Sequence, residues 1–243
     1  MKTAYLIGLK KPAARYLAYA LVLLLFSSLP VIGAQDSRDR YHQPDTVMDL
    51  MGVKAGMVIG EVGAGSGYFT FHLARRVGES GKVYANDISR QALNSLEQRK
   101  EREGITHIET IVGELDDPLL PQGLDMVFIV NAFHDITRQV ALLNSLAPSL
   151  NPGAAVVIID RDPEKFRDSA GHFLTQEEVL EKIEKSVFQL DRIETFLPQH
   201  NIYILRNPAG HGSNPSAGQR ENQISRDTLE PEAANPRTIK ETT

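Results

Sequence analysis

The sequence MVIGEVGAGSGY, residues 57–68, decides the fold of this 243-residue chain. Its first half is a short apolar run, which is typical of a buried strand. Three glycines follow, and their missing side chains let the chain turn tightly and let a ligand approach the backbone. Residues 68–77 then place apolar side chains at helical spacing, so a helix begins directly after the loop with its free N–H groups facing the same place. The stretch predicts a strand, a glycine loop and a helix that together bind a ligand.

Outward from this unit, the same alternation continues to residue 206. Strands that alternate with helices are typical of a parallel sheet covered on both faces. The last two apolar runs are close enough in sequence to form an antiparallel hairpin. We therefore expect an α/β fold with a Rossmann-like, seven-stranded, mostly parallel sheet, a C-terminal antiparallel hairpin and helices on both faces. The pattern predicts further strands at 82–87, 107–112, 124–131, 154–160, 190–197 and 201–206, and helices at 89–104, 138–150 and 176–187.

The first 34 residues differ in composition from the rest. They hold four basic and no acidic side chains, an apolar run of ten at 17–26, and small residues at Gly33 and Ala34. This pattern is typical of a secretory signal peptide that is cut after Ala34. The alternative is an uncleaved anchor in the inner membrane, but a helix of ten residues spans about 15 Å of a hydrocarbon core about 30 Å thick. We expect an exported, periplasmic protein with no membrane contact after cleavage.

The last 37 residues, 207–243, contain four prolines and almost no large apolar side chains, which predicts a disordered tail. One globular domain is left, at 35–206. The formal net charge is −5, and removal of residues 1–34 makes it −9, so nucleic acid is not an expected partner. The chain has no cysteine, which rules out disulfides and cysteine nucleophiles. No feature of the sequence predicts a particular oligomeric state.

The side chains around the glycine loop favour a cationic ligand that carries a ribose. Glu61 precedes the loop, where it would repel a pyrophosphate but suits a positive charge. A dinucleotide-binding loop of the form G-x-G-x-x-G would need glycine at position 68, which is Tyr, so a nicotinamide-dependent oxidoreductase is disfavoured. Asp87 ends the second strand, 20 residues beyond Gly67, where an acid can hold both hydroxyls of a ribose.

Four motifs in this order resemble those of class I S-adenosylmethionine-dependent methyltransferases. They are EVGAGSGYFT at 61–70, VYANDIS at 83–89, and the segments 113–136 and 146–163, within a resemblance that covers residues 41–206. The resemblance implies a methyltransferase with S-adenosylmethionine as its cofactor. By position, it assigns to the cofactor Glu61 (amino group), Gly63, Ala64, Gly65 and Gly67 (methionine portion), Asp87 (ribose), Ile88, Glu114 and Leu115 (adenine), and Asn131 (methionine portion and substrate).

The substrate side of the expected site centres on His134. This residue follows the fourth strand, where substrate meets cofactor in this family, and imidazole titrates near neutral pH, so we predict that His134 is a catalytic base. A loop or helix-capping contact is the alternative. Asp135 is predicted to be the N-cap of the next helix. Asp160 and the two residues after it either line the substrate site or form a turn with Pro163. No metal is expected, because Asp160, Asp135 and Asn131 do not follow the order of a metal-assisted methyltransferase site.

Two segments are candidates to cover the site. Residues 41–44 lead into the segment before the first strand, which either covers the cofactor or forms a simple packing helix. Residues 171–174 (GHFL) precede Thr175 and Glu178, which have the spacing of a capping box, and they are a candidate loop over the substrate.

The expected acceptor is a small molecule. Segments 131–136 and 171–198 are similar to those of small-molecule methyltransferases, including exported bacterial members. The alternative is a protein acceptor, because Gln43-Pro44 and the GSGY loop are similar to protein-isoaspartate methyltransferases. Arsenite methylation is excluded, since that branch works through cysteine thiols. A non-catalytic domain that keeps the fold and binds a ligand is a second class of function, and the intact set of Glu61, glycine loop and Asp87 disfavours it.

Overall fold

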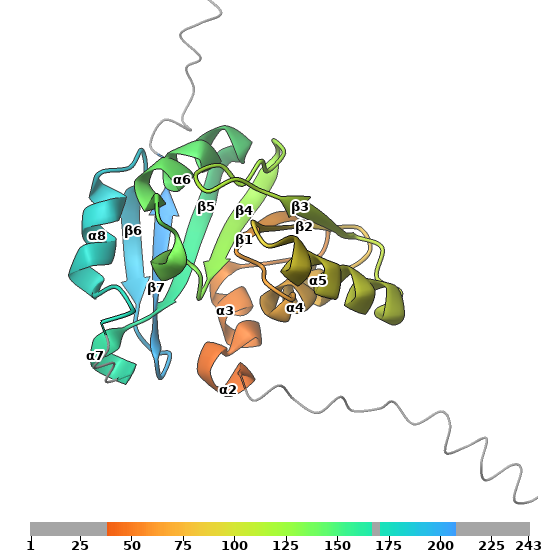
Figure 1. The fold of residues 1–243 in the computed structure, drawn as a ribbon, viewed down its shortest axis with the longest axis horizontal. Helices are drawn as coiled ribbons and strands as arrows, with labels where there is room; N and C mark the ends of the chain where they lie inside the picture. The colour runs from red at the N-terminus through yellow and green to blue at the C-terminus, as the bar shows by residue number, and fades with distance from the viewer. Residues whose placement is uncertain (1–37, 167–170, 208–243) are drawn as a thin grey trace, which may run out of the picture. The chain divides into compact units, whose positions relative to one another are not determined.

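A computed structural model describes residues 38–166 and 171–207 of the chain (Figure 1). The predicted signal peptide at 1–34, and all but the first residue of the predicted tail at 207–243, lie outside the described residues. Within the described ranges, no helix is both long and apolar enough to cross a membrane.

The seven predicted strands form one sheet, in the order β3-β2-β1-β4-β5-β7-β6. Strands β1 to β5 run parallel, whereas β7 is antiparallel to both of its neighbours. The strand order reverses between β1 and β4, and in open α/β sheets this switch point is where ligands bind. The strands are β1 (Val58–Val62), β2 (Lys82–Asp87), β3 (Ile108–Val112), β4 (Leu124–Val130), β5 (Leu150–Arg161), β6 (Gln189–Glu194) and β7 (His200–Arg206).

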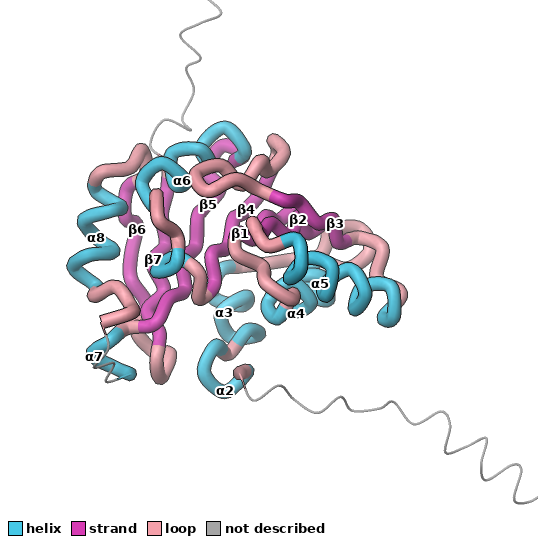
Figure 2. The backbone as a smooth tube through the Cα atoms, in the orientation of Figure 1, coloured by secondary structure: helices cyan, strands magenta, loops and turns pink. Residues whose placement is uncertain are grey.

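Helices cover both faces of the sheet, as predicted (Figure 1, Figure 2). Successive side chains of a strand point to opposite faces, so Phe128 of β4 packs in one apolar cluster and Ile129 in the other. Each cluster is closed by the apolar stripe of the helices above it. The helices of the first cluster are α3 (Pro44–Met51), α4 (Tyr68–Val77) and α5 (Arg90–Glu103), and those of the second are α6 (Gln139–Leu146) and α8 (Gln176–Glu184).

Side-chain caps fix where two of these helices begin. The Ser89 hydroxyl accepts the N–H of Ala92 at 3.3 Å at the start of α5, and Gly104 (φ 67) ends that helix in the left-handed conformation that glycine adopts readily. Thr175 and Glu178 form the predicted capping box at the start of α8. Each contact satisfies backbone N–H groups that have no partner within the helix.

The boundary between α6 and β5 differs from the prediction. The predicted helix 138–150 is too long, because Pro148 has no N–H to continue it and the chain passes into a 3-10 turn, η2 (Ala147–Ser149). β5 then begins at Leu150, and the Asn-Pro-Gly sequence at 151–153, predicted to precede the strand, lies within it beside a shift in the register with β4. α8 likewise ends before the predicted boundary.

Candidate active site

Two adjoining pockets lie at the switch point between β1 and β4. The first has a volume of ≈ 290 Å³ and the second of ≈ 250 Å³, and Gly63 and Asn131 border both. Of the ten predicted cofactor residues, only Gly67 lines neither pocket. The first pocket is also lined by Asp87, Ile88, Glu114 and Leu115, and the second by Glu61, Ala64 and Gly65.

The glycine loop after β1 lies against the end of β4. Gly63 has φ 73, and a Cβ built on it would lie 2.4 Å from the Cβ of Ala132. Gly67 (φ 90) serves the packing of helices instead, since a Cβ there would lie 2.8 Å from Phe71 of α4 and 2.9 Å from Leu96 of α5. Only glycine accommodates both the left-handed backbone and these close approaches.

Asp87 is fixed by two backbone groups at the end of β2. Its Oδ2 accepts the N–H of Gly65 at 2.8 Å, and its Oδ1 accepts the N–H of Ser89 at 2.8 Å. Each carboxylate oxygen can accept more than one hydrogen bond, so further acceptor sites are left for the hydroxyls of a ligand. Beside it, the side chains of Ile88 and Leu115 are 58% and 56% exposed, which offers an apolar surface to a flat ring.

Glu61 is a buried acid at the end of β1. Its Oε2 accepts the Thr70 hydroxyl at 2.5 Å. Burial, with a smaller contribution from the charge of Asp87, raises the pKa of Glu61 to about 8, although the Thr70 hydrogen bond acts in the opposite direction. The carboxyl group is therefore neutral at pH 7 until a cation approaches it in the second pocket.

Asn131 follows β4 in a strained conformation, with φ 51. Its backbone N–H donates to the carbonyl of Ile159 at 2.7 Å, which fixes the residue against the end of β5. Its side-chain Oδ1 is buried and has no hydrogen-bond partner among the described residues. A buried acceptor without a partner costs about 1–3 kcal/mol, and an N–H donor from a ligand would remove that cost.

His134 lies in the 3-10 turn η1 (Phe133–Asp135), directly after β4. Its backbone N–H donates to Oδ2 of Asp160 at 2.8 Å, and its Nδ1 lies 2.7 Å from Oδ1 of the same carboxylate. Both side chains are 3% exposed. Because the carboxylate only accepts, Nδ1 carries the proton and Nε2 keeps the lone pair. Burial lowers the pKa of His134, but the hydrogen bond and charge of Asp160 outweigh burial, so the pKa lies above its ordinary value.

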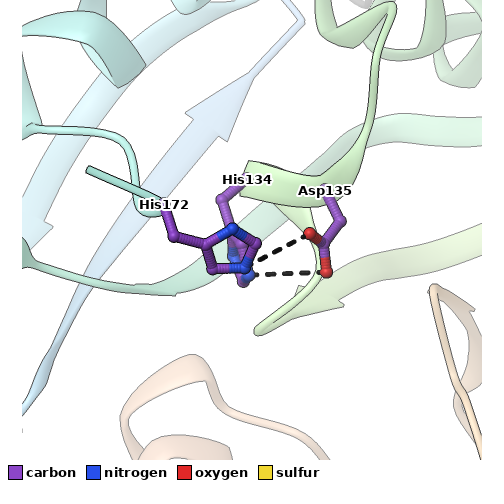
Figure 3. Close-up of side chains that lie close together, drawn as sticks. All are labelled: His134, Asp135 and His172. Carbon is purple, nitrogen blue, oxygen red and sulfur yellow. Dashed lines mark ion pairs between the residues drawn. The ribbon is translucent and has the colours of Figure 1, made fainter. Parts of the chain in front are cut away.

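Asp135 is not the N-cap of the next helix, as was predicted. Arg138 occupies the N-cap position of α6, because η1 and a short extended stretch separate Asp135 from that helix. The Asp135 side chain is 65% exposed and lines the first pocket. Its Oδ2 lies 3.5 Å from Nε2 of His134 (Figure 3). Asp135 thus contacts the buried His134 and also forms part of the wall of the first pocket.

The loop at 171–174 packs on His134. The ring centroid of Phe173 lies 4.5 Å from that of His134, and the centroid of His172 lies 5.0 Å from it. The loop thus contacts the predicted catalytic residue, but none of its residues lines either pocket, and its role as a cover over the substrate stays a prediction. Asp160 supports His134 from the sheet side and does not form a simple turn with Pro163; Asp162 does that, by accepting the N–H of Glu164 at 2.9 Å.

The segment before β1 borders the second pocket. The short helix α2 (Asp39–His42) places His42 at its wall, where its ring lies 4.4 Å from that of His200 between centroids. The Tyr68 hydroxyl donates to Asp39 Oδ1 at 2.9 Å, which ties this segment to the start of α4. His42 thus borders the pocket, whereas α3, which follows it, lines neither pocket and packs in the first apolar cluster; a cover over the cofactor stays a prediction.

Three residues that the sequence analysis did not single out complete the pockets. Thr70 holds Glu61, and Arg38 lines the second pocket. Asn86 lines the first pocket and donates to the carbonyl of Pro118 at 2.8 Å, which holds the loop after β3. Thr70 and Asn86 are polar residues at buried positions of a helix and a strand, and that is the signal that could have revealed them.

A family model described as a methyltransferase domain matches residues 53–221 of the chain. The chain belongs to this family. Curated relatives include the demethylmenaquinone methyltransferases of Bacillus velezensis, 27% identical over 132 residues, and Bacillus licheniformis, 30% identical over 132 residues. These matches cover 54% of this chain and 57% and 56% of the relatives, so the chain spans a little over half the length of these proteins.

Similar solved structures indicate which class of methyltransferase the fold belongs to. A crystal structure of a SAM-dependent methyltransferase from Aquifex aeolicus is similar at a TM-score of 0.64 and 26% identity, covering 70% of this chain and 93% of that one. The [4+2]-cyclase SpnF has the same fold at a TM-score of 0.59 and 12% identity, covering 69% and 80%. The chain is thus a class I S-adenosylmethionine-dependent methyltransferase in fold and family.

The residues of the two pockets fit this cofactor. Glu61, neutral when no cation is near, suits the ammonium group, and the unpartnered Oδ1 of Asn131 can accept one of its N–H bonds. Asp87 has acceptor capacity left for the ribose hydroxyls. The exposed apolar side chain of Ile88 suits the adenine ring.

Proposed function

We propose that the protein transfers a methyl group from S-adenosylmethionine to a small-molecule acceptor. One arrangement carries the proposal: a single glycine loop separates the buried acid Glu61 in the second pocket from Asp87 in the first. The cofactor has an ammonium group at one end and a ribose and adenine at the other. The ammonium group would meet Glu61, and the ribose would meet Asp87.

The residues of the chain contribute mainly by orientation. The cofactor, when bound, supplies a methyl group activated by a sulfonium. Methyl transfer is an in-line displacement, and such a reaction gains most from holding the two reactants in the correct geometry. Gly63 and Asn131 border both pockets and therefore flank the region where the reacting centre would be held.

His134 is proposed to activate the acceptor. Its Nδ1–H is held by Asp160, so the lone pair of Nε2 is the group that can take a proton from the acceptor. The raised pKa of His134 helps the ring to keep that proton while the new bond forms. Asp135, whose Oδ2 lies 3.5 Å from Nε2, lines the first pocket, whereas His134 does not, so the acceptor is proposed to reach Nε2 beside the Asp135 carboxylate.

The acceptor is proposed to carry an apolar ring and an ionisable hydroxyl. Ile136 and Leu142 add apolar surface to the first pocket and Thr137 adds a hydroxyl, so the acceptor is proposed to share this pocket with the ribose and adenine of the cofactor. The names of the Bacillus relatives make a demethylated quinol the first compound to assay.

The experiment is calorimetry on residues 35–243 with S-adenosylmethionine, repeated with Asp87→Ala. Binding by the unmodified protein and a loss of at least tenfold in affinity in the variant are expected, because the ribose loses its carboxylate partner. No binding by the unmodified protein would overturn the proposal. Binding without transfer of a radiolabelled methyl group to any quinol or small-molecule extract would favour the non-catalytic alternative.

We also propose that residues 1–34 direct export and are removed. The basic start, the short apolar run and the small residues at Gly33 and Ala34 support this. N-terminal sequencing of the protein from the periplasmic fraction is expected to begin at Gln35. Recovery of the intact chain from the membrane fraction would support the anchor instead.

A further inference from the structure

Three side chains that can ligate a metal gather beside the first pocket. His134 and Asp135 come from η1, and His172 comes from the loop before α8 (Figure 3). One ligand atom from each lies within 4.8 Å of the others. The two histidines are separated by 38 residues in the sequence, and the fold alone brings them to the same carboxylate.

Two of the separations between these atoms are close to those of a tetrahedral site. Nε2 of His134 lies 3.5 Å from Oδ2 of Asp135, and Nε2 of His172 lies 3.6 Å from Oδ1. In a tetrahedral zinc site with metal–ligand distances of about 2.0–2.1 Å, neighbouring ligand atoms lie about 3.3–3.4 Å apart. The two separations involve different oxygens of the Asp135 carboxylate, and the ligand nitrogens of the two histidines lie within 4.8 Å of each other, so binding of one ion by all three residues requires the side chains to move closer together.

The surroundings of His134 are also those of a metal ligand. Asp160, 3% exposed, holds Nδ1 at 2.7 Å and the backbone N–H at 2.8 Å. Histidines that bind metals usually donate their other ring N–H to a carboxylate, which fixes the tautomer and orients the ring. This pair leaves Nε2 as the only lone pair of the ring and keeps it directed at Asp135.

We propose that His134, Asp135 and His172 bind one divalent transition metal ion, for which Zn²⁺ is the best match. Two imidazoles and one carboxylate form a ligand set that zinc accepts, and three protein ligands leave a fourth position open for an oxygen of a small molecule. Asp135 lines the first pocket, whereas neither histidine does, so the proposed metal ion lies beside that pocket.

The consequence for catalysis rests on the proposed function. Metal coordination uses the same lone pair of His134 that was proposed to accept a proton. In the metal-loaded protein, the cation would therefore take the activating role and would lower the pKa of a hydroxyl bound at its open position. Binding of the metal itself does not depend on S-adenosylmethionine.

The test is a calorimetric titration of the chelator-treated full chain with Zn²⁺, followed by Co²⁺ and Mg²⁺. One Zn²⁺ per chain, visible absorption of bound Co²⁺ typical of four-coordination, and no uptake of Mg²⁺ are expected. His172→Ala is the decisive variant, because the His172 side chain is 59% exposed. It should lower the Zn²⁺ affinity at least tenfold, and Asp160→Asn should lower it about 10–100-fold.

A matched control removes a histidine elsewhere. His72 lies in α4 beside Asp39, at 3.3 Å, and His72→Ala should bind Zn²⁺ as the unmodified chain does. Melting curves of every variant confirm folding. Substoichiometric Zn²⁺, or equal affinity in His172→Ala, would overturn the site. Binding of S-adenosylmethionine is measured separately. A chain that binds the cofactor but does not bind Zn²⁺ contradicts this inference alone. A chain that binds Zn²⁺ but does not bind the cofactor contradicts the proposed function.

Discussion

Two regions of the site are held in place by different means. We call the glycine loop with Asp87, which is proposed to hold the methyl donor, the donor end. We call the residues around His134, which are proposed to face the acceptor, the acceptor end. At the donor end, backbone groups do the work: the N–H of Gly65 binds Asp87, and Gly63 lies against the end of β4 with no room for a side chain. At the acceptor end, side chains from separate segments hold one another. Asp160 is hydrogen-bonded to His134, and the ring of Phe173 packs against the ring of His134.

This difference predicts different effects for substitutions at the donor end and at the acceptor end. Because the donor end depends on backbone conformation, changes at its glycines should alter stability and cofactor affinity together. Because the acceptor end depends on the identity of a few side chains, changes there should alter the reaction and leave cofactor affinity unchanged. Four substitutions test this contrast.

The largest effect is expected for His134→Asn. The amide N–H can still serve Asp160, so the buried carboxylate keeps its partner, while the basic Nε2 is lost. Turnover should fall about 10²–10⁴-fold, and the Kd for S-adenosylmethionine should not change. Both are measured by methyl-transfer kinetics and calorimetry, with His72→Ala as the matched histidine control. An equal change in Kd would assign His134 to the donor end.

Gly63→Ala should cost about 2–4 kcal/mol of stability. The new Cβ would lie 2.4 Å from that of Ala132, and φ is 73, so overpacking and backbone strain add. Gly65→Ala is the matched control, since φ is 57 but no atom lies within 4 Å, and it should cost about 1–2 kcal/mol. Chemical denaturation measures both, and adding Ala132→Gly to Gly63→Ala should restore part of the loss. Equal costs at the two glycines would show that the close approach is unimportant.

Glu61 should make cofactor affinity depend on pH. Its pKa is raised to about 8, so the free protein holds a proton that the ammonium group must displace, and affinity should rise up to tenfold per pH unit until about pH 8. Without ligand, the unfolded chain ionises this acid first, so stability should fall as pH rises from about 4.5 to about 8, by at most about 1.4 kcal/mol per unit. Calorimetry in buffers of different ionisation enthalpy counts the released proton, and Glu61→Gln should abolish that release. A pH-independent Kd in the unmodified protein would place the ammonium group elsewhere.

The smallest effect is expected for Ile88→Ala. Ile88 is 58% exposed, so its removal should leave the melting temperature unchanged, while the adenine loses apolar contact worth about 1 kcal/mol, or a fewfold in Kd. Val187→Ala, at a side chain 45% exposed outside both pockets, should change neither quantity. A lower melting temperature for Ile88→Ala would mean that this side chain serves the fold.

The same contrast explains what the sequence could predict. Strands, helices and the residues at the carboxyl ends of the first strands follow from local patterns, so the fold and the positions of Glu61 and Asp87 were predictable. The partnership of His134 with Asp160 depends on the register of β4 and β5, which pairs Val130 with Ile159. No local pattern encodes that register. The predicted start of β5 was wrong because Asn-Pro-Gly at 151–153 has the composition of a turn but lies within the strand.

One feature of the sheet also limits how the chain can be shortened. Among the described residues β7 is the last strand in sequence, yet it lies between β5 and β6 and pairs with both. Until residues 200–206 leave the ribosome, the apolar strand β5 has an open edge that can pair with other chains. A nonsense change or a proteolytic cut near Pro198 would therefore unpair two ladders at once. Such a truncated chain should aggregate, and the cell would lose the protein entirely instead of keeping a weaker form.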